Sequence, residues 1–178
     1  SDPVQVTITA SRNNTGIMYD LPYADLTVVK RIRADHINFA NGNPTFIFTV
    51  KGNDLLGNYH EYSEFFEFTK DYVQRNTGSD GYVSLSYTWK SIPVGTSYNV
   101  MENDTNRYYL TDVTSRDSNV SIRRLKNSAY GVRPEDTFRV TTNLQAKLTG
   151  TTITFTNTKK AWGNWGHNAV VKNTVKVV

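Results

Sequence analysis

Asn157 stands at the end of a short alternating segment, Ile153–Lys159, in which apolar residues and threonines take turns. In a strand, this alternation places Ile153, Phe155 and Asn157 on one face and the threonines on the other. The apolar face must point into a core, so a carboxamide follows two hydrophobic side chains inward. A buried amide without a hydrogen-bond partner is costly in free energy. We therefore expect Asn157 to meet a polar group inside the protein.

Two other segments place a polar side chain in the same kind of position. In Leu26–Arg33, alternation puts Lys30 on the face that carries leucine, valine and isoleucine, although lysine is rarely fully buried. In Ser97–Glu102, Glu102 continues a face formed by a tyrosine and a valine. We predict that Lys30, Glu102 and Asn157 meet in the core.

These three residue types suit one reaction. Desolvation disfavours the charged form of a lysine, so the Lys30 amine can lose its proton and act as a nucleophile. Its attack on the Asn157 side chain would expel ammonia and leave an isopeptide bond, and close contact would supply much of the rate. Glu102 is expected to act as the catalytic acid, donating a hydrogen bond to the Asn157 side-chain carbonyl and relaying protons. The alternative is a buried Lys–Glu ion pair with a hydrogen-bonded asparagine.

Such a reaction turns over once, so we predict self-processing and not an enzyme, with no cofactor and no metal. A hydrolase is disfavoured because His36, His60 and His167 are scattered along the chain. The pairs Asn53-Asp54 and Asn103-Asp104 could touch calcium, but turn chemistry explains them better.

The elements that must position these groups read as short strands separated by turns. Alternating segments occur at 3–9, 26–33, 45–50, 82–87, 97–102 and 153–159, with weaker ones at 108–110, 121–122 and 137–141. Turns are predicted at 13–16 and 41–44, and residues 59–73 favour strand over helix. This pattern predicts an all-β fold, an antiparallel β-sandwich.

The pattern of apolar and polar residues divides the chain into three segments. Residues 1–20 form an N-terminal strand or the end of a preceding domain, and residues 21–160 form the sandwich. Residues 161–178 are a C-terminal strand or the start of a following segment, and 169–178 alternate like a strand that could pair with another sheet.

Composition narrows the function classes. The 178 residues are enough for a real core, and there is no cysteine to staple it. A net charge of +4 is modest, and the basic clusters at 31–33 and 123–126 are expected to be solvated faces, so no nucleic-acid partner is predicted. No apolar run is long enough to insert into a membrane.

The segment from Ile92 to Glu102, IPVGTSYNVME, resembles the LPxGxYxVxE signature of Cna-B-type domains. ITFTNTK at 153–159 is similar to the closing strand of that family, LTVVK at 26–30 to its opening strand, and PTFIFTVKG at 44–52 to the next one. The resemblance covers roughly residues 21–160 and is closest to the domains of Gram-positive major pilins and surface adhesins.

The resemblance implies a reversed immunoglobulin-like sandwich in which Lys30 and Asn157 are crosslinked and Glu102 promotes the bond. It implies a structural domain of a pilin or adhesin on the bacterial cell surface, resistant to force and proteases. Its partners would be other pilin or adhesin domains or subunits, and a host glycan or matrix protein. No LPxTG sorting signal and no clear pilin-motif lysine occur. A second hypothesis is a glycan-binding β-sandwich, motivated by the tryptophans Trp89, Trp162 and Trp165.

Overall fold

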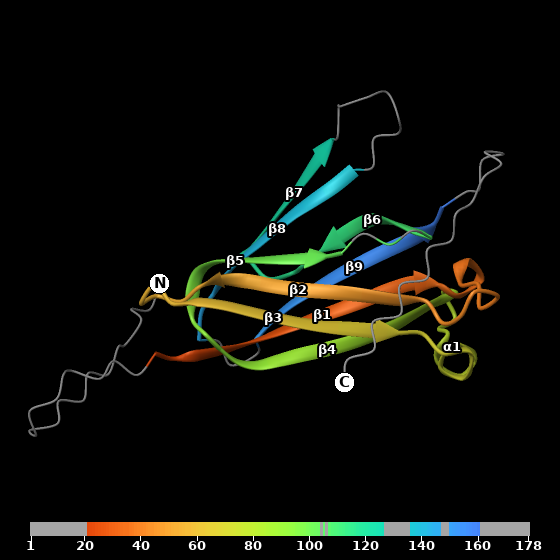
Figure 1. Cartoon of the computed structure of the whole chain (residues 1–178), viewed down its shortest axis with the longest axis horizontal. Coiled ribbons are helices and arrows are strands. Elements are labelled where there is room, and N and C mark those ends of the chain that lie inside the picture. The colour runs from red at the N-terminus through yellow and green to blue at the C-terminus, as the bar shows by residue number, and fades with distance from the viewer. Residues whose placement is uncertain (1–20, 104, 106, 127–135, 147–149, 161–178) are drawn as a thin grey trace, which may run out of the picture.

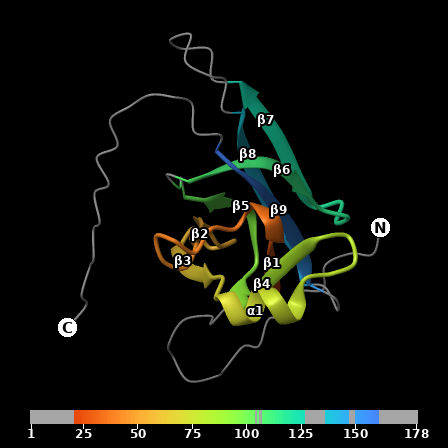
Figure 2. The same cartoon turned by 90° about the vertical axis from the view of Figure 1, so that its right-hand side faces the viewer.

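The computed structural model describes residues 21–160 except 104, 106, 127–135 and 147–149, and within them two β-sheets pack face to face (Figures 1 and 2). One sheet has four strands in the order β4 (Tyr82–Pro93), β1 (Tyr23–Arg33), β9 (Thr151–Lys159) and β6 (Tyr108–Thr114). The other has five, in the order β3 (Tyr59–Glu67), β2 (Thr45–Asn53), β5 (Gly95–Glu102), β8 (Asp136–Leu144) and β7 (Val120–Lys126). The prediction of an all-β sandwich is confirmed.

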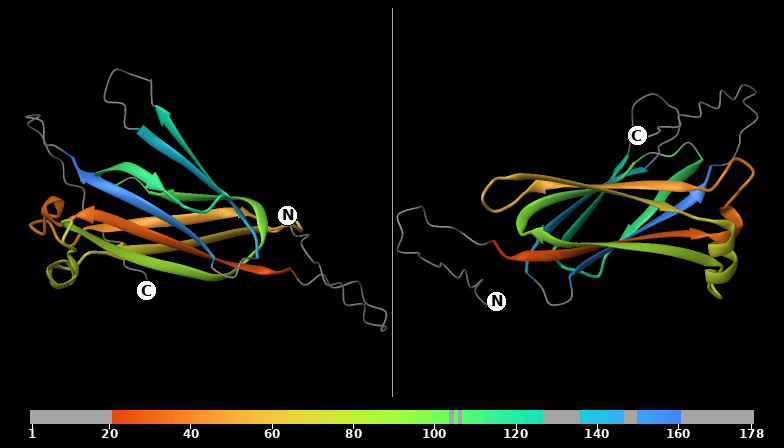
Figure 3. Two further views of the ribbon diagram at one scale, coloured as in Figure 1. Left: turned by 180° about the vertical axis from the view of Figure 1, so that it is seen from behind. Right: turned by 60° about the horizontal axis from the view of Figure 1, so that its bottom comes forward.

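The first and last of these strands lie side by side. β1 pairs antiparallel with β4, but its other neighbour, β9, runs parallel to it (Figure 3). The predicted antiparallel arrangement is correct for the other strand pairs of the described residues and wrong for this one. Parallel neighbours need a long crossover between them, and the chain between β1 and β9 supplies one by building the whole second sheet.

The core lies between the sheets and follows the predicted alternation. Along β1 and β9 every second residue is buried, and β5 alternates in the same way from Tyr98 onward. Aromatic rings join the two layers: the ring of Phe48 on β2 packs edge-on against that of Phe155 on β9, with centroids 5.0 Å apart. The core thus puts the inner faces of β1, β5 and β9 in contact with one another.

A close backbone crossing fixes where β5 begins. A Cβ atom on Gly95 would lie 2.3 Å from the Asn53 carbonyl oxygen and 2.7 Å from the Tyr98 ring, so no larger residue fits there. Tyr98 is fully buried, and its hydroxyl donates to the Pro93 carbonyl over 2.8 Å. The glycine and the tyrosine of the signature segment therefore anchor the strand that ends in Glu102.

The expectation of strand over 59–73 is correct for β3 and wrong beyond it. A short helix, α1, occupies Lys70–Asn76 and contains the end of that range. Thr69 is its N-cap, and the threonine side chain accepts a hydrogen bond from the Tyr72 amide over 3.2 Å. The capping bond stabilises the start of the helix, so the chain does not continue as a strand beyond this point. A 3-10 turn, η1 (Ala34–His36), follows β1.

The remaining strand predictions differ from the structure chiefly in length. β4 continues to Pro93, beyond the expected 82–87, and pairs with β1 over almost its whole course. Strands were also expected at 3–9 and 169–178 and a turn at 13–16; these segments lie outside the described residues. In the part of the chain that is described, no helix is long and apolar enough to span a membrane.

Candidate functional site

Lys30 lies in the middle of β1 with its side chain fully buried. Burial lowers the pKa of its amine from 10.5 to about 8, and the charge of Glu102 and the hydrogen bond to it oppose this shift. Nζ lies over the Phe46 ring, 4.3 Å from the ring centroid, so this ring forms an apolar wall beside the amine. At pH 7 about a tenth of the amine is therefore neutral, whereas an ordinary lysine has roughly one in several thousand.

Asn157 reaches the same point from the neighbouring strand. In the parallel register Lys30 pairs with Phe155 and Ile32 pairs with Asn157, so the asparagine lies two positions further along the same face. Its side chain is almost completely buried. The amide oxygen Oδ1 accepts a hydrogen bond from the Lys30 Nζ. The nucleophile and the carboxamide predicted from sequence are thus in contact.

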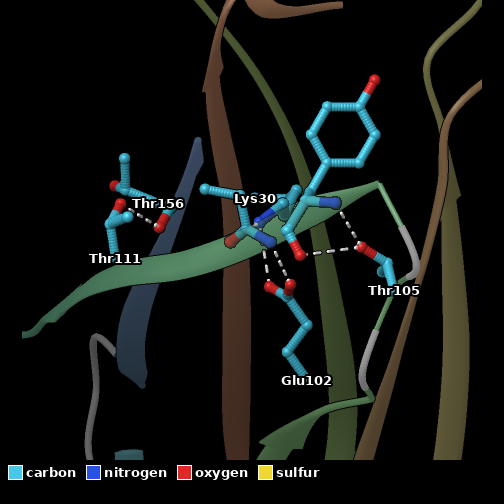
Figure 4. Close-up of polar contacts among 7 residues, drawn as sticks. Lys30, Glu102, Thr105, Thr111 and Thr156 are labelled. Carbon is cyan, nitrogen blue, oxygen red and sulfur yellow. Dashed lines mark hydrogen bonds and ion pairs between the residues drawn. The ribbon is translucent and has the colours of Figure 1, made fainter. Parts of the chain in front are cut away.

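Glu102 comes from the opposite sheet, at the end of β5, and only 3% of its side chain is exposed. Its Oε2 accepts a hydrogen bond from the Lys30 Nζ over 2.9 Å, and the two side chains point toward one another in Figure 4. Its other oxygen, Oε1, accepts a hydrogen bond from the Asn157 Nδ2. We expected Glu102 to donate to the amide oxygen; instead, it faces the amide nitrogen.

The three side chains therefore form a closed triangle in which each contacts the other two. Among the described residues, no fully buried side-chain nitrogen or oxygen lacks a hydrogen-bond partner. The amine lies against the carboxamide it would attack, and one carboxylate contacts both the attacking nitrogen and the nitrogen that would leave. This arrangement can exchange one amide bond for another without help from solvent. It also satisfies every demand of a buried ion pair with a hydrogen-bonded asparagine.

A backbone irregularity beside Asn157 was not foreseen. The β6–β9 register shifts between Leu110 and Asp112, where Asn157 pairs with Leu110 and Thr156 with Asp112. The Thr111 hydroxyl, at the shift, donates to the Thr156 carbonyl over 3.0 Å (Figure 4). Bulges commonly re-aim a side chain next to a functional site. Sequence alternation carries no signal for the bulge, because a single inserted residue leaves the pattern on β9 intact.

The Phe46 wall was also not foreseen from the sequence. Phe46 belongs to β2 in the opposite sheet and packs against Phe68 and Tyr108. Which inward ring would cover the amine depends on how the two sheets are superposed. Strand parity does not contain that information.

Asp54 and His60, which were considered for a calcium site and for a hydrolase site, have structural roles. Asp54 is buried, and its carboxylate accepts hydrogen bonds from the backbone amides of Leu56 and Asn58, which close a turn. Contact with His60, over 2.9 Å, is the main cause that lowers the pKa of Asp54 to about 2. No group of three potential metal ligands occurs among the described residues.

The structure also places residues of the predicted basic cluster and of the glycan-binding hypothesis. Arg31 pairs with Asp80 at the surface, as expected for a solvated face. Trp89 is buried in the core and so offers no sugar platform. Trp162, Trp165 and His167 lie outside the described residues.

In comparisons with protein-family models, with curated proteins and with solved structures, no match was found.

Proposed function

We propose that this chain is a structural domain of a bacterial surface pilin or adhesin, stabilised by an isopeptide bond between Lys30 and Asn157 that forms autocatalytically. The observation that carries the proposal is the buried contact of Lys30, Asn157 and Glu102, which come from β1, β9 and β5. The resemblance of the Ile92–Glu102 segment to Cna-B-type domains supports it, and with it a reversed immunoglobulin-like type of sandwich. The domain acts outside the cell, on the wall or in a pilus.

The proposed chemistry balances within the triangle. The neutral Lys30 Nζ attacks the Asn157 Cγ, and the attacking nitrogen gives up a proton to Glu102 Oε2, with which it is already hydrogen-bonded. The Glu102 carboxyl then gives this same proton to Nδ2, which already contacts its Oε1, and Nδ2 leaves as ammonia. The C–N bond to Nδ2 breaks, the C–N bond to Nζ forms, and Glu102 returns to its starting state. The reaction needs no oxidant and no cofactor, and it occurs once per chain.

The position of the bond suits a load-bearing module. β1 and β9 are neighbouring parallel strands, so tension that enters before β1 and leaves after β9 pulls them past each other along their length. The crosslink would join these strands directly and pass the force around the remaining fold. Unlike a disulfide, it resists reduction. Partners in such an assembly are other pilin or adhesin domains or subunits, and a host glycan or matrix protein at its tip.

Intact-mass spectrometry of the purified chain tests the bond. We expect a mass about 17 Da below the sequence mass, the loss of one ammonia. Lys30→Ala and Asn157→Ala should each show the full mass of their own sequence. A full mass for the unaltered chain would reject the crosslink, and the ion-pair interpretation would replace it.

A further inference from the structure

A groove of about 490 Å³ opens at the end of the sandwich where β1 and β9 both finish. Because these strands are parallel neighbours, the chain that follows each of them emerges at the same edge. One wall comes from the segment after β1, including His36, Ile37 and Asn38, and another from Lys159 and Lys160. Arg107 and Tyr108, at the start of β6, complete the lining.

The charges in this groove do not cancel. Among the described residues that line it, Lys159 and Arg107 carry positive charge, and the one carboxylate is that of Asp35. Asp35 is already bound by Arg33, which donates from Nε over 2.9 Å and from Nη2 over 2.8 Å. The Arg107 guanidinium donates to the Asn38 backbone carbonyl over 3.2 Å, an uncharged acceptor. The groove therefore attracts anions.

The position of Arg107 also suits recognition of an anion through two of its oxygens. The bond to the Asn38 carbonyl uses one of its five N–H donors and holds the guanidinium in place. Lys159 is exposed, and no described carboxylate lies within ion-pair distance of its amine. An anchored arginine and an exposed lysine on one groove can together bind a carboxylate or a sulfate.

The uncharged part of the lining indicates the rest of the ligand. Asn38 and Asn41 also line the groove. The Asn38 Oδ1 already accepts from the Ala40 amide over 2.8 Å, so its Nδ2 is the group that can donate to a ligand hydroxyl, whereas the Asn41 amide can both donate and accept. Ile37 and Tyr108 add apolar surface. The volume lies within the range of small-molecule sites. We infer that this groove binds a saccharide that carries a carboxylate or a sulfate. Neither the tryptophans nor the crosslink takes part in this binding.

Isothermal titration calorimetry of the full chain tests this inference with glucuronate, glucose 6-sulfate, glucose, N-acetylglutamate and inorganic sulfate as probes. The two charged sugars should bind, and glucose, N-acetylglutamate and sulfate should bind at least about tenfold more weakly. The relative affinities of glucuronate and glucose 6-sulfate identify the preferred acid group. Added salt should weaken binding of both sugars.

Matched variants locate the site. Arg107→Gln should weaken charged-sugar binding about tenfold, and Lys159→Gln, which removes a side chain with no described partner, about two- to fivefold. Lys90→Gln removes an exposed lysine of β4 and should change nothing. No heat from either charged sugar at about 10 mM, equal binding of glucose, N-acetylglutamate or sulfate, or an equal loss in Lys90→Gln would overturn the inference.

Discussion

At the scale of residues, the site joins two demands that usually conflict. A buried lysine is stabilised by an anionic partner, whereas a nucleophilic amine must be neutral. Here burial outweighs the influence of Glu102, so the pKa of Lys30 falls to about 8 and not further. A buried ion pair by itself is weak evidence of stabilisation. In the proposed reaction the third member, Asn157, supplies the electrophilic carbon, because its carboxamide lies against the amine.

Glu102→Gln separates the reactive interpretation from the ion-pair one. Glutamine has nearly the same shape but cannot relay a proton between Nζ and Nδ2. We expect this variant to show its full sequence mass, with Lys30 and Asn157 both unmodified. Glu61→Gln, which alters an exposed partner of Lys51, should lose ammonia as the unaltered chain does. Loss of ammonia by Glu102→Gln at the ordinary rate would remove the acid from the mechanism.

The lowered pKa of Lys30 sets a pH dependence for bond formation. Because the ordinary value of 10.5 falls to about 8, raising the pH toward 8 increases the fraction of neutral amine. Chain purified unfolded from inclusion bodies can be refolded at different pH values, and ammonia loss followed by mass spectrometry. The rate should rise about tenfold per pH unit between roughly pH 5 and 8, then level off. A rate that falls over this range would contradict a neutral amine nucleophile.

At the scale of elements, strand parity predicted which side chains point inward. Lys30, Glu102 and Asn157 were each placed by alternation within one strand, and each faces the core as expected. Parity could not show that β1 and β9 are parallel neighbours, because strand pairing depends on chain topology. Parity also missed the bulge at Thr111, which is a register shift between β6 and β9. It missed helix α1 as well, because that helix begins at a local capping bond to Thr69.

The close crossing at Gly95 gives a prediction for β5. In Gly95→Ala, the added methyl group would overlap the Asn53 carbonyl and the Tyr98 ring, so the start of the strand must shift. We expect a loss of about 1–3 kcal/mol in the free energy of unfolding, measured by chemical denaturation in a Glu102→Gln background. Thr96→Ala, at the exposed neighbouring position, should change it by less than about 0.5 kcal/mol. A neutral Gly95→Ala would show that the crossing is loose.

At the scale of the whole molecule, the crosslink would close almost the entire sandwich into one loop. Lys30 and Asn157 are 127 positions apart. A loop of this order stabilises a fold by about 4–5 kcal/mol in the chain-entropy account. Almost all of the described elements, from β1 to β9, belong to the loop that the crosslink would close.

Thermal unfolding tests the size of this effect. Both Asn157→Ala and Glu102→Gln should melt roughly 10–20 °C below the unaltered chain, since each abolishes the same loop closure. The two variants remove different side chains, so their shared loss reports the crosslink. A drop in only one of them would point to a local packing defect instead.

Single-molecule pulling addresses the mechanical role. With the bond in place, the 127-residue separation cannot be extended, so about 400 Å of contour length stays hidden. Glu102→Gln should release that length in an unfolding event. An unaltered chain that extends as far as the variant would show that the bond does not carry the load.

The most direct test of the central claim is tandem mass spectrometry of a proteolytic digest of the full chain. We expect a branched peptide in which the Lys30 side chain is joined to that of Asn157, with one ammonia missing. Separate peptides carrying an unmodified Lys30 and an unmodified Asn157 would contradict it.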